Sequence, residues 1–175
     1  MPWCIPLAKS KPDLRELVFF ALLGAMTFGA KVVMMGLPNI EPVSLMILIF
    51  GAVFGLRALY PVYTYVMLEF VLYGLNLWSI NYLYVWTILA LLGWLLRKMD
   101  GAWAWALVSG SFGLCFGLLC APVYLFTGGW ALAVSWWISG IPFDLLHAAG
   151  NFVIALVLFL PLRKVLEQLH GRIIA

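Results

Sequence analysis

The chain has 175 residues, of which 66% are hydrophobic and only 10% are charged, and its mean hydropathy is +1.09. Soluble domains are about half apolar and a quarter charged, so this composition excludes a soluble globular protein and predicts an all-α integral membrane protein. The formal charge of +3, from 10 Lys and Arg against 7 Asp and Glu, reports membrane orientation in such a protein and does not indicate nucleic-acid binding.

An apolar helix needs about 20 residues to cross the hydrocarbon core of a bilayer. On this criterion the sequence predicts a single membrane domain over residues 1–175, built as a bundle of six transmembrane helices. No signal peptide is expected, because no charged segment precedes a cleavable apolar core. The predicted spans are approximately 14–36, 42–57, 58–76, 80–97, 102–127 and 139–163.

The basic residues predict the orientation of the bundle. Every Lys and Arg except Lys31 falls on one side of the predicted spans, and the opposite loops 37–42, 76–81 and 127–139 contain neither residue. Basic residues gather on the cytoplasmic side of membrane proteins, so both termini are expected inside and these three loops outside. The nine residues on the inner side are Lys9, Lys11, Arg15, Arg57, Arg97, Lys98, Arg163, Lys164 and Arg172.

The outward loops combine aromatic, amide and carboxylate side chains. The first is the turn Leu37-Pro38-Asn39-Ile40-Glu41, whose proline cannot continue a helix. The second and third contribute Trp and Tyr, which also prefer the membrane interface. An interfacial belt explains a single Trp, but it does not explain the polar residues interleaved with the rings.

Charged groups inside spans are costly and usually face a cavity or a partner. Lys31 lies in the first span, and Glu69 lies in the third with Tyr65 and Tyr73 one turn to either side. The simple structural alternative is that Lys31 pairs with Glu69 or with Asp144, and that Asn151 bonds a neighbouring helix.

The sixth predicted span carries a polar stripe of its own. Asp144, His147 and Asn151 are spaced i, i+3 and i+7 and so share one helical face. Together with the loops, these stripes predict an outward-facing small-molecule site with aromatic walls and a few placed polar groups. The expected binding residues are Lys31, Asn39, Glu41, Glu69, Trp78, Asn81, Tyr82, Trp130, Trp136, Trp137, Asp144, His147 and Asn151.

No catalytic or metal site is expected, and no cofactor. Cys4, Cys115 and Cys120 match no metal-ligand spacing. A serine-protease dyad of Ser109 or Ser111 with His147 is disfavoured, because the predicted spans place the two kinds of residue at opposite depths.

Small residues recur along one side of the first span. Ala21, Ala25 and Gly29 follow one another at intervals of four, a spacing that lets helices approach closely. They predict either internal packing or a docking face for another membrane protein.

These features together resemble the substrate-binding S component of energy-coupling factor (ECF) transporters. The resemblance covers essentially the whole chain. It rests on the Ala21/Ala25 patch, Lys31 before the Leu37–Glu41 turn, six predicted spans, and a last helix that carries Asp144, His147 and Asn151 and ends in Pro161-Leu162-Arg163.

The resemblance implies a subunit of the bacterial cytoplasmic membrane that captures a vitamin or related micronutrient from outside. It would dock, through Ala21 and Ala25, on a transmembrane scaffold protein and two cytoplasmic ATPases. The chain itself has no Gly-rich phosphate loop, so ATP hydrolysis would belong to those partners, and the chain is not expected to be an enzyme.

The turn and the Trp-rich loops look closest to S components for cobalamin, the preferred substrate, or for a queuosine-type precursor. Pantothenate, folate and thiamine-precursor binders stay open, although a multi-anionic folate would find only Lys31 as an outer cation. The rival of another class is a stand-alone proton-coupled secondary transporter, in which Lys31, Glu69, Asp144 and His147 relay protons.

Overall fold

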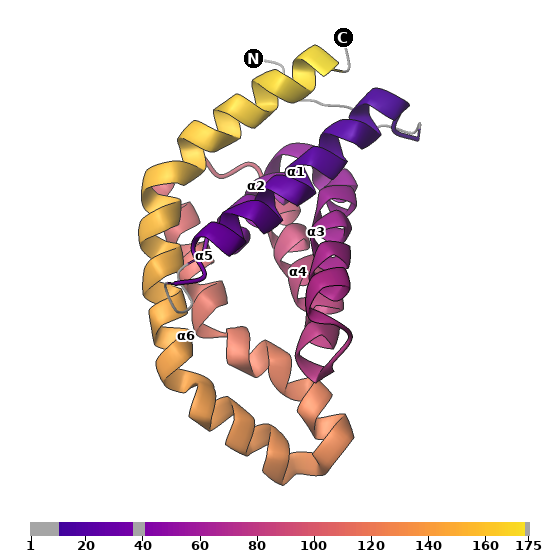
Figure 1. The fold of residues 1–175 in the computed structure, drawn as a ribbon. Coiled ribbons are helices and arrows are strands. Elements are labelled where there is room, and N and C mark those ends of the chain that lie inside the picture. The colour runs from indigo at the N-terminus through magenta and orange to yellow at the C-terminus, as the bar shows by residue number, and fades with distance from the viewer. Residues whose placement is uncertain (1–10, 37–40, 174–175) are drawn as a thin grey trace.

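The computed structural model describes residues 11–36 and 41–173, and these residues form helices joined by short turns, with no strand among them. The expectation of an all-α protein is therefore confirmed (Figure 1). In chain order the elements are α1 (Leu14–Val33), α2 (Val43–Phe54), the 3₁₀ helix η1 (Gly55–Ala58), α3 (Leu59–Tyr73), α4 (Leu77–Leu95), α5 (Ala102–Leu114) and α6 (Phe116–Ile173).

Several of these helices are long and apolar enough to cross a membrane. Within the described residues the qualifying segments are Leu14–Val33, Val43–Tyr73, Leu77–Leu95 and Ala102–Ile173. This agrees with a multi-pass membrane protein, although the segments divide the chain differently from the six expected spans. The second segment joins α2 to α3 through η1, and the last joins α5 to α6.

Local sequence explains where the helices begin and end. The Asp13 carboxylate accepts a hydrogen bond from the Glu16 backbone N–H at 2.8 Å and so caps α1. Asn76 and Ser79 form a reciprocal capping box at the start of α4. Gly55 and Gly74 end α2 and α3 with φ of 62° and 76°, a conformation that residues with a side chain rarely adopt.

The centre of the molecule is α2, which is buried along almost its whole length. It packs mainly on α4, where Gly51 lies against the Ala90 carbonyl and Gly93 against the Leu48 carbonyl so closely that a side chain could fit at neither position. The two backbones are therefore in direct contact, and α2 and α4 form the core on which the other helices pack.

The last helix is unusually long and is bent. It runs for 58 residues, and Gly129 alone leaves helical geometry, with φ of 77° and ψ of −174°. Figure 1 shows α6 turning back on itself in its first part and then curving along the bundle to the C-terminal end. The expected loop over 127–139 is thus helical on both sides of Gly129, because a single glycine makes the turn.

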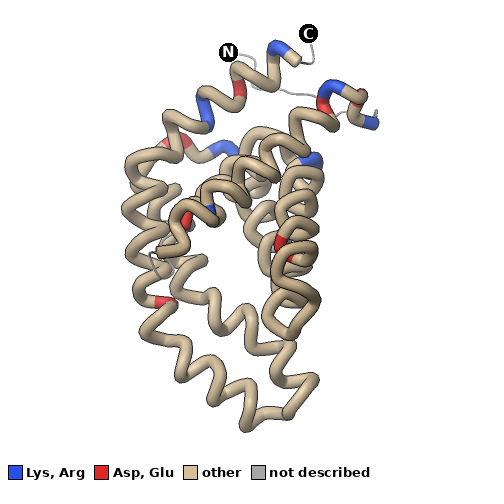
Figure 2. Tube along the Cα trace, in the orientation of Figure 1, with Lys and Arg blue, Asp and Glu red and all other residues tan. Residues whose placement is uncertain are grey.

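The first turn of α1 and the last turns of α6 lie at the same end of the molecule (Figure 1). Figure 2 shows that most Lys and Arg gather towards this end. Lys31 lies in the last turn of α1, at the other end of that helix from Arg15.

Candidate functional site

An ion pair between Lys31 and Glu69 joins α1 to α3. The Lys31 ammonium lies 2.8 Å from Glu69 Oε1 and 2.9 Å from Oε2. Glu69 is fully buried and Lys31 nearly so. The sequence left open whether Lys31 pairs with Glu69 or with Asp144. The structure shows the pair with Glu69.

Three aromatic rings surround the same ammonium. The Lys31 Nζ lies 4.9 Å from the centroid of the Trp78 ring, 5.4 Å from Tyr82 and 5.5 Å from Tyr73. Such distances allow cation–π attraction. Trp78 and Tyr82 share one face of α4, so the start of α4 forms a wall over the ion pair.

Glu41 completes the charged group from the turn before α2. It is half-buried, and its burial raises the pKa of the carboxyl above the usual 4.5, with the negative charge of Glu69 adding to the rise and the Lys31 ammonium opposing it. Three of the expected binding residues, Lys31, Glu41 and Glu69, thus lie together.

Aromatic side chains continue inward from this group. Tyr82 lies 5.2 Å from Trp86, and Tyr65 lies 6.2 Å from Trp86. The Tyr65 hydroxyl and the Trp86 indole N–H are buried and have no hydrogen-bond partner among the described residues. Buried polar groups are normally paired, so these two atoms are available to a ligand.

The sixth-span stripe lies inside the bundle, as its spacing predicted. Asp144, His147 and Asn151 are all buried. His147 Nε2 lies 3.3 Å from the Ser44 hydroxyl of α2, and the Phe116 ring lies 5.0 Å from His147 and 5.6 Å from Trp86. Through Phe116 the histidine adjoins the aromatic wall.

The other two members of the stripe hold α6 on α5. Both Asp144 oxygens accept from the Gly117 backbone N–H, and the Asn151 amide donates to the Ser109 carbonyl at 3.4 Å. The Ser109 hydroxyl has no partner among the described residues. The described structure therefore shows no Ser109–His147 hydrogen bond.

Asn81 is buried within α4 and bonded to protein. Its side-chain oxygen accepts from the Tyr84 hydroxyl at 2.8 Å, and its amide donates to the Leu77 carbonyl at 3.4 Å. Tyr84 also donates to the Leu119 carbonyl of α6. Asn81 thus positions Tyr84 between α4 and α6.

The remaining expected residues are not brought to the Lys31 group. Trp130, Trp136 and Trp137 are exposed on α6, Trp130 to 75%, and Trp136 stacks on Tyr124 with ring centroids 3.9 Å apart. Asn39 lies outside the described residues.

The small residues of α1 divide between two faces. Ala21, Ala25 and Gly29 are exposed, and nothing lies within 4 Å of a Cβ placed at Gly29. Gly24 faces α3, where an added Cβ would lie 2.6 Å from the Pro61 carbonyl oxygen. Gly24 is therefore the small residue that packs on α3, whereas Ala21, Ala25 and Gly29 remain exposed within the described structure.

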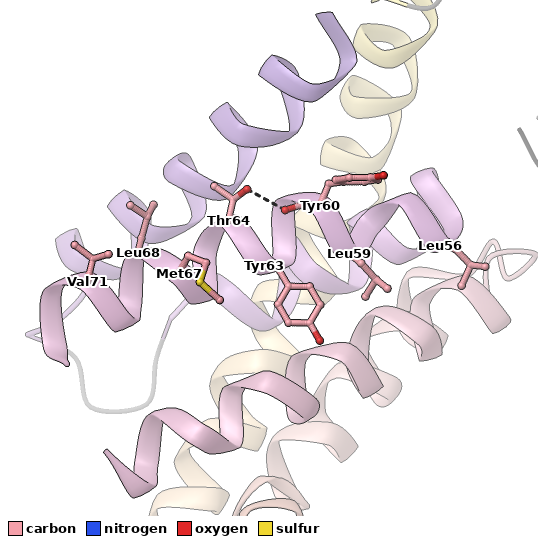
Figure 3. Close-up of a pocket in the computed structure, with 8 residues that line it drawn as sticks. All are labelled: Leu56, Leu59, Tyr60, Tyr63, Thr64, Met67, Leu68 and Val71. Atoms are coloured by element: carbon pink, nitrogen blue, oxygen red, sulfur yellow. Dashed lines mark hydrogen bonds between the residues drawn. The ribbon is translucent and has the colours of Figure 1, made fainter. Parts of the chain in front are cut away.

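A separate apolar groove of about 810 Å³ runs along the outer face of α3 (Figure 3). Its only hydrogen bond drawn in Figure 3 joins the Thr64 hydroxyl to the Tyr60 carbonyl. None of its residues belongs to the expected site, and its composition matches a lipid-facing surface. The lining residues are Leu56, Leu59, Tyr60, Tyr63, Thr64, Met67, Leu68 and Val71.

Sequence reasoning did not include Trp86 and Ser44 among the site residues. For Trp86 a signal existed, because Trp78, Tyr82 and Trp86 follow one another at intervals of four and so share a helical face. Ser44 carried no such signal, since its position depends on how α2 packs on α6.

Comparison of the chain with protein-family models, with curated proteins and with solved structures gave no match.

Proposed function

We propose that the chain is the substrate-binding S component of an ECF-type importer. The observation that carries this proposal is that α1 has two different faces. Lys31 points into a charged and aromatic site, while Ala21, Ala25 and Gly29 of the same helix face outward with no partner in the described structure. One helix thus presents both a ligand group and a close-packing face for another membrane protein.

In this proposal the chain crosses the membrane six times. The fifth crossing consists of α5 and the first part of α6, Gly129 makes the outer turn, and the rest of α6 crosses back. Both termini are cytoplasmic, since the basic residues gather at the end where α1 begins and α6 finishes (Figure 2). The Lys31 group then opens towards the outside of a bacterial cytoplasmic membrane.

The cargo is a vitamin-class small molecule, with cobalamin preferred and a queuosine-type precursor or pantothenate as alternatives. The chain itself is not an enzyme in this proposal. A transmembrane scaffold protein and two cytoplasmic ATPases supply the energy, and the scaffold packs on the Ala21/Ala25 face.

The proposal is tested in two steps. The purified protein is first screened by thermal shift against water-soluble vitamins and their precursors, where a ligand at a hundredfold excess over its Kd raises stability by about 2.7 kcal/mol. The protein is then reconstituted with the scaffold and ATPases, and ATP-driven uptake of the ligand is measured. Ala25→Trp is expected to abolish uptake while ligand binding by the isolated subunit persists. Loss of binding as well, or uptake that needs no ATPase, would contradict the proposal.

A proton-coupled secondary transporter is the second candidate, favoured by the ionisable groups Lys31, Glu41, Glu69 and His147 buried or half-buried in the bundle. Uptake by the reconstituted chain alone, driven by a proton gradient, distinguishes it from the S component.

A further inference from the structure

The surroundings of the Lys31 ammonium are those of a cation-binding site. Rings of Trp78, Tyr82 and Tyr73 lie within 5.5 Å of Nζ, and Glu69 supplies a carboxylate at 2.8 Å. Aromatic cages closed by a carboxylate are how proteins recognise ammonium ligands. Here a side chain of the protein itself occupies the cage.

The charges around the cage are not balanced by Lys31 alone. Glu69 pairs with this ammonium, Glu41 lies close enough for its charge to interact with both residues, and the Trp and Tyr rings add the negative faces of their π systems. An anionic ligand entering this group would meet two carboxylates, whereas a cation would be attracted by every group except Lys31.

The cage is not sealed. Tyr73 is 43% exposed, and Lys31 lies in the last turn of α1. A lysine ammonium sits on a flexible four-carbon stem, so rotation of that side chain is the motion that would take the Lys31 ammonium out of the cage.

The interior side of the cage offers hydrogen bonds that the protein does not use. The Trp86 N–H has no hydrogen-bond partner among the described residues, and the Tyr65 hydroxyl lies beside the Glu69 carboxylate. Both side chains are fully buried. They are suited to the polar edge of a flat ligand whose cationic nitrogen lies in the cage.

We propose that Lys31 is a built-in occupant of a cation cage formed by Trp78, Tyr82 and Tyr73 over Glu69, and that the captured nutrient is an organic cation that displaces its ammonium. This inference rests on the proposed function in that the displacing cation is the cargo. Under this inference a vitamin-class substrate with a cationic nitrogen replaces cobalamin as the preferred cargo.

The test is calorimetric titration of the purified protein with three probes of similar size, benzylammonium, benzyl alcohol and benzoate. Lys31→Met removes the occupant and keeps an apolar stem. Benzylammonium is expected to bind this variant at least about tenfold more tightly than it binds the unmodified protein, with no gain for the neutral or anionic probe. Adding Glu69→Gln is expected to remove the gain.

Two control variants separate the cage from general effects. Lys31→Arg keeps a cation in the cage and is expected to show no gain. Lys98→Met removes an exposed lysine from the α4–α5 turn and is also expected to show none. An equal gain for benzyl alcohol, or no gain for benzylammonium, overturns the proposal and leaves Lys31 and Glu69 as a structural ion pair.

If Lys31→Met does not fold, it is extracted in the presence of either benzylammonium or benzyl alcohol. Recovery of folded protein with the ammonium alone supports the cage, and recovery with both or with neither overturns it. The titration uses the isolated subunit, so its failure leaves ATP-driven uptake of a neutral vitamin standing. Conversely, absence of coupled uptake contradicts the proposed function without affecting the cage.

Discussion

The Asp144 carboxylate accepts the backbone N–H of Gly117 at 3.0 and 3.1 Å, which ties α6 to its own first turn across 27 residues. Gly117 is the second residue of α6, where backbone N–H groups have no intrahelical acceptor. Asp144 therefore acts as a cap supplied from a distant part of the same helix, and its negative charge suits the positive end of the helix dipole.

Asp144→Ala is expected to lower the free energy of unfolding by about 1–2 kcal/mol, because it leaves that N–H unpaired. Asp144→Asn keeps one acceptor oxygen and should cost less. Thermal unfolding in detergent measures both. Gly117→Ala is the matched variant, since its Cβ would press on the carboxylate, and its effect should not add to that of Asp144→Ala. Full additivity would contradict the cap.

Two glycines of α1 give opposite expectations for the same substitution. Gly24→Ala places a Cβ 2.6 Å from the Pro61 oxygen, so it should destabilise the protein by roughly 1–3 kcal/mol. Gly29→Ala meets nothing within 4 Å and should leave stability unchanged or slightly raised, since alanine favours helix. The melting temperatures of the two variants check this, and equal effects would mean that α1 packs on α3 differently.

Glu41 gives a pH dependence whose sign follows from its burial. The folded-state pKa lies above 4.5, so the folded state binds a proton that the unfolded state has released. The contribution of the protonated carboxyl to stability is complete below 4.5 and is lost as the pH rises through the folded-state pKa.

Glu41→Gln has no such titration. Compared with the unmodified protein, the variant should match its stability in acid and exceed it at neutral pH. Melting temperatures of both proteins, measured from below 4.5 to neutral pH, check the prediction. A variant that is less stable at neutral pH would show that the Glu41 charge is held by its attraction to Lys31.

The opposite end of the bundle contains a second buried ion cluster. Glu16 of α1 accepts two bonds from Arg57 Nη1, at 2.7 and 2.8 Å, and its Oε1 lies 2.8 Å from His170 Nε2 of α6. The carboxylate therefore joins α1, η1 and the end of α6.

Glu16→Ala is expected to cost roughly 2–3 kcal/mol, below the value for a fully buried pair because the Arg57 side chain is partly exposed. The end of α6 should also become sensitive to limited proteolysis. Glu167→Gln is the control: it removes a pair with Arg163 within one helix, which is worth about 0.3–0.5 kcal/mol. If the Glu16→Ala protein were as stable and as resistant to proteolysis as the Glu167→Gln control, the cluster would not hold the end of α6 on α1.

Composition and periodicity were sufficient to predict the helical class and the buried face of the last helix. Asp144, His147 and Asn151 lie inside because their spacing places them on one side of a helix, whatever its neighbours. Lys31 and Glu69 could be foreseen as partners, since a charge in an apolar span requires one.

The rest depends on packing that no local pattern encodes. Glu16 and His170 lie 154 positions apart, and nothing near either residue indicates the other. The turn at Gly129 was predicted as a longer loop because its flanking Trp and Ser residues resemble an interfacial segment. A positive φ at one glycine bends the chain without unwinding the helix to either side.

The short, enclosed α2 has a consequence for how the protein is made. Its 12 residues span about 18 Å, against about 30 Å of hydrocarbon, and its main packing partner α4 is synthesised after it. A nascent chain that ends before α4 therefore lacks the surface that holds α2 at its depth. Assembly in the membrane must wait for α4 to emerge from the ribosome, so chains truncated before Leu77 are expected to be recognised and degraded by membrane quality control.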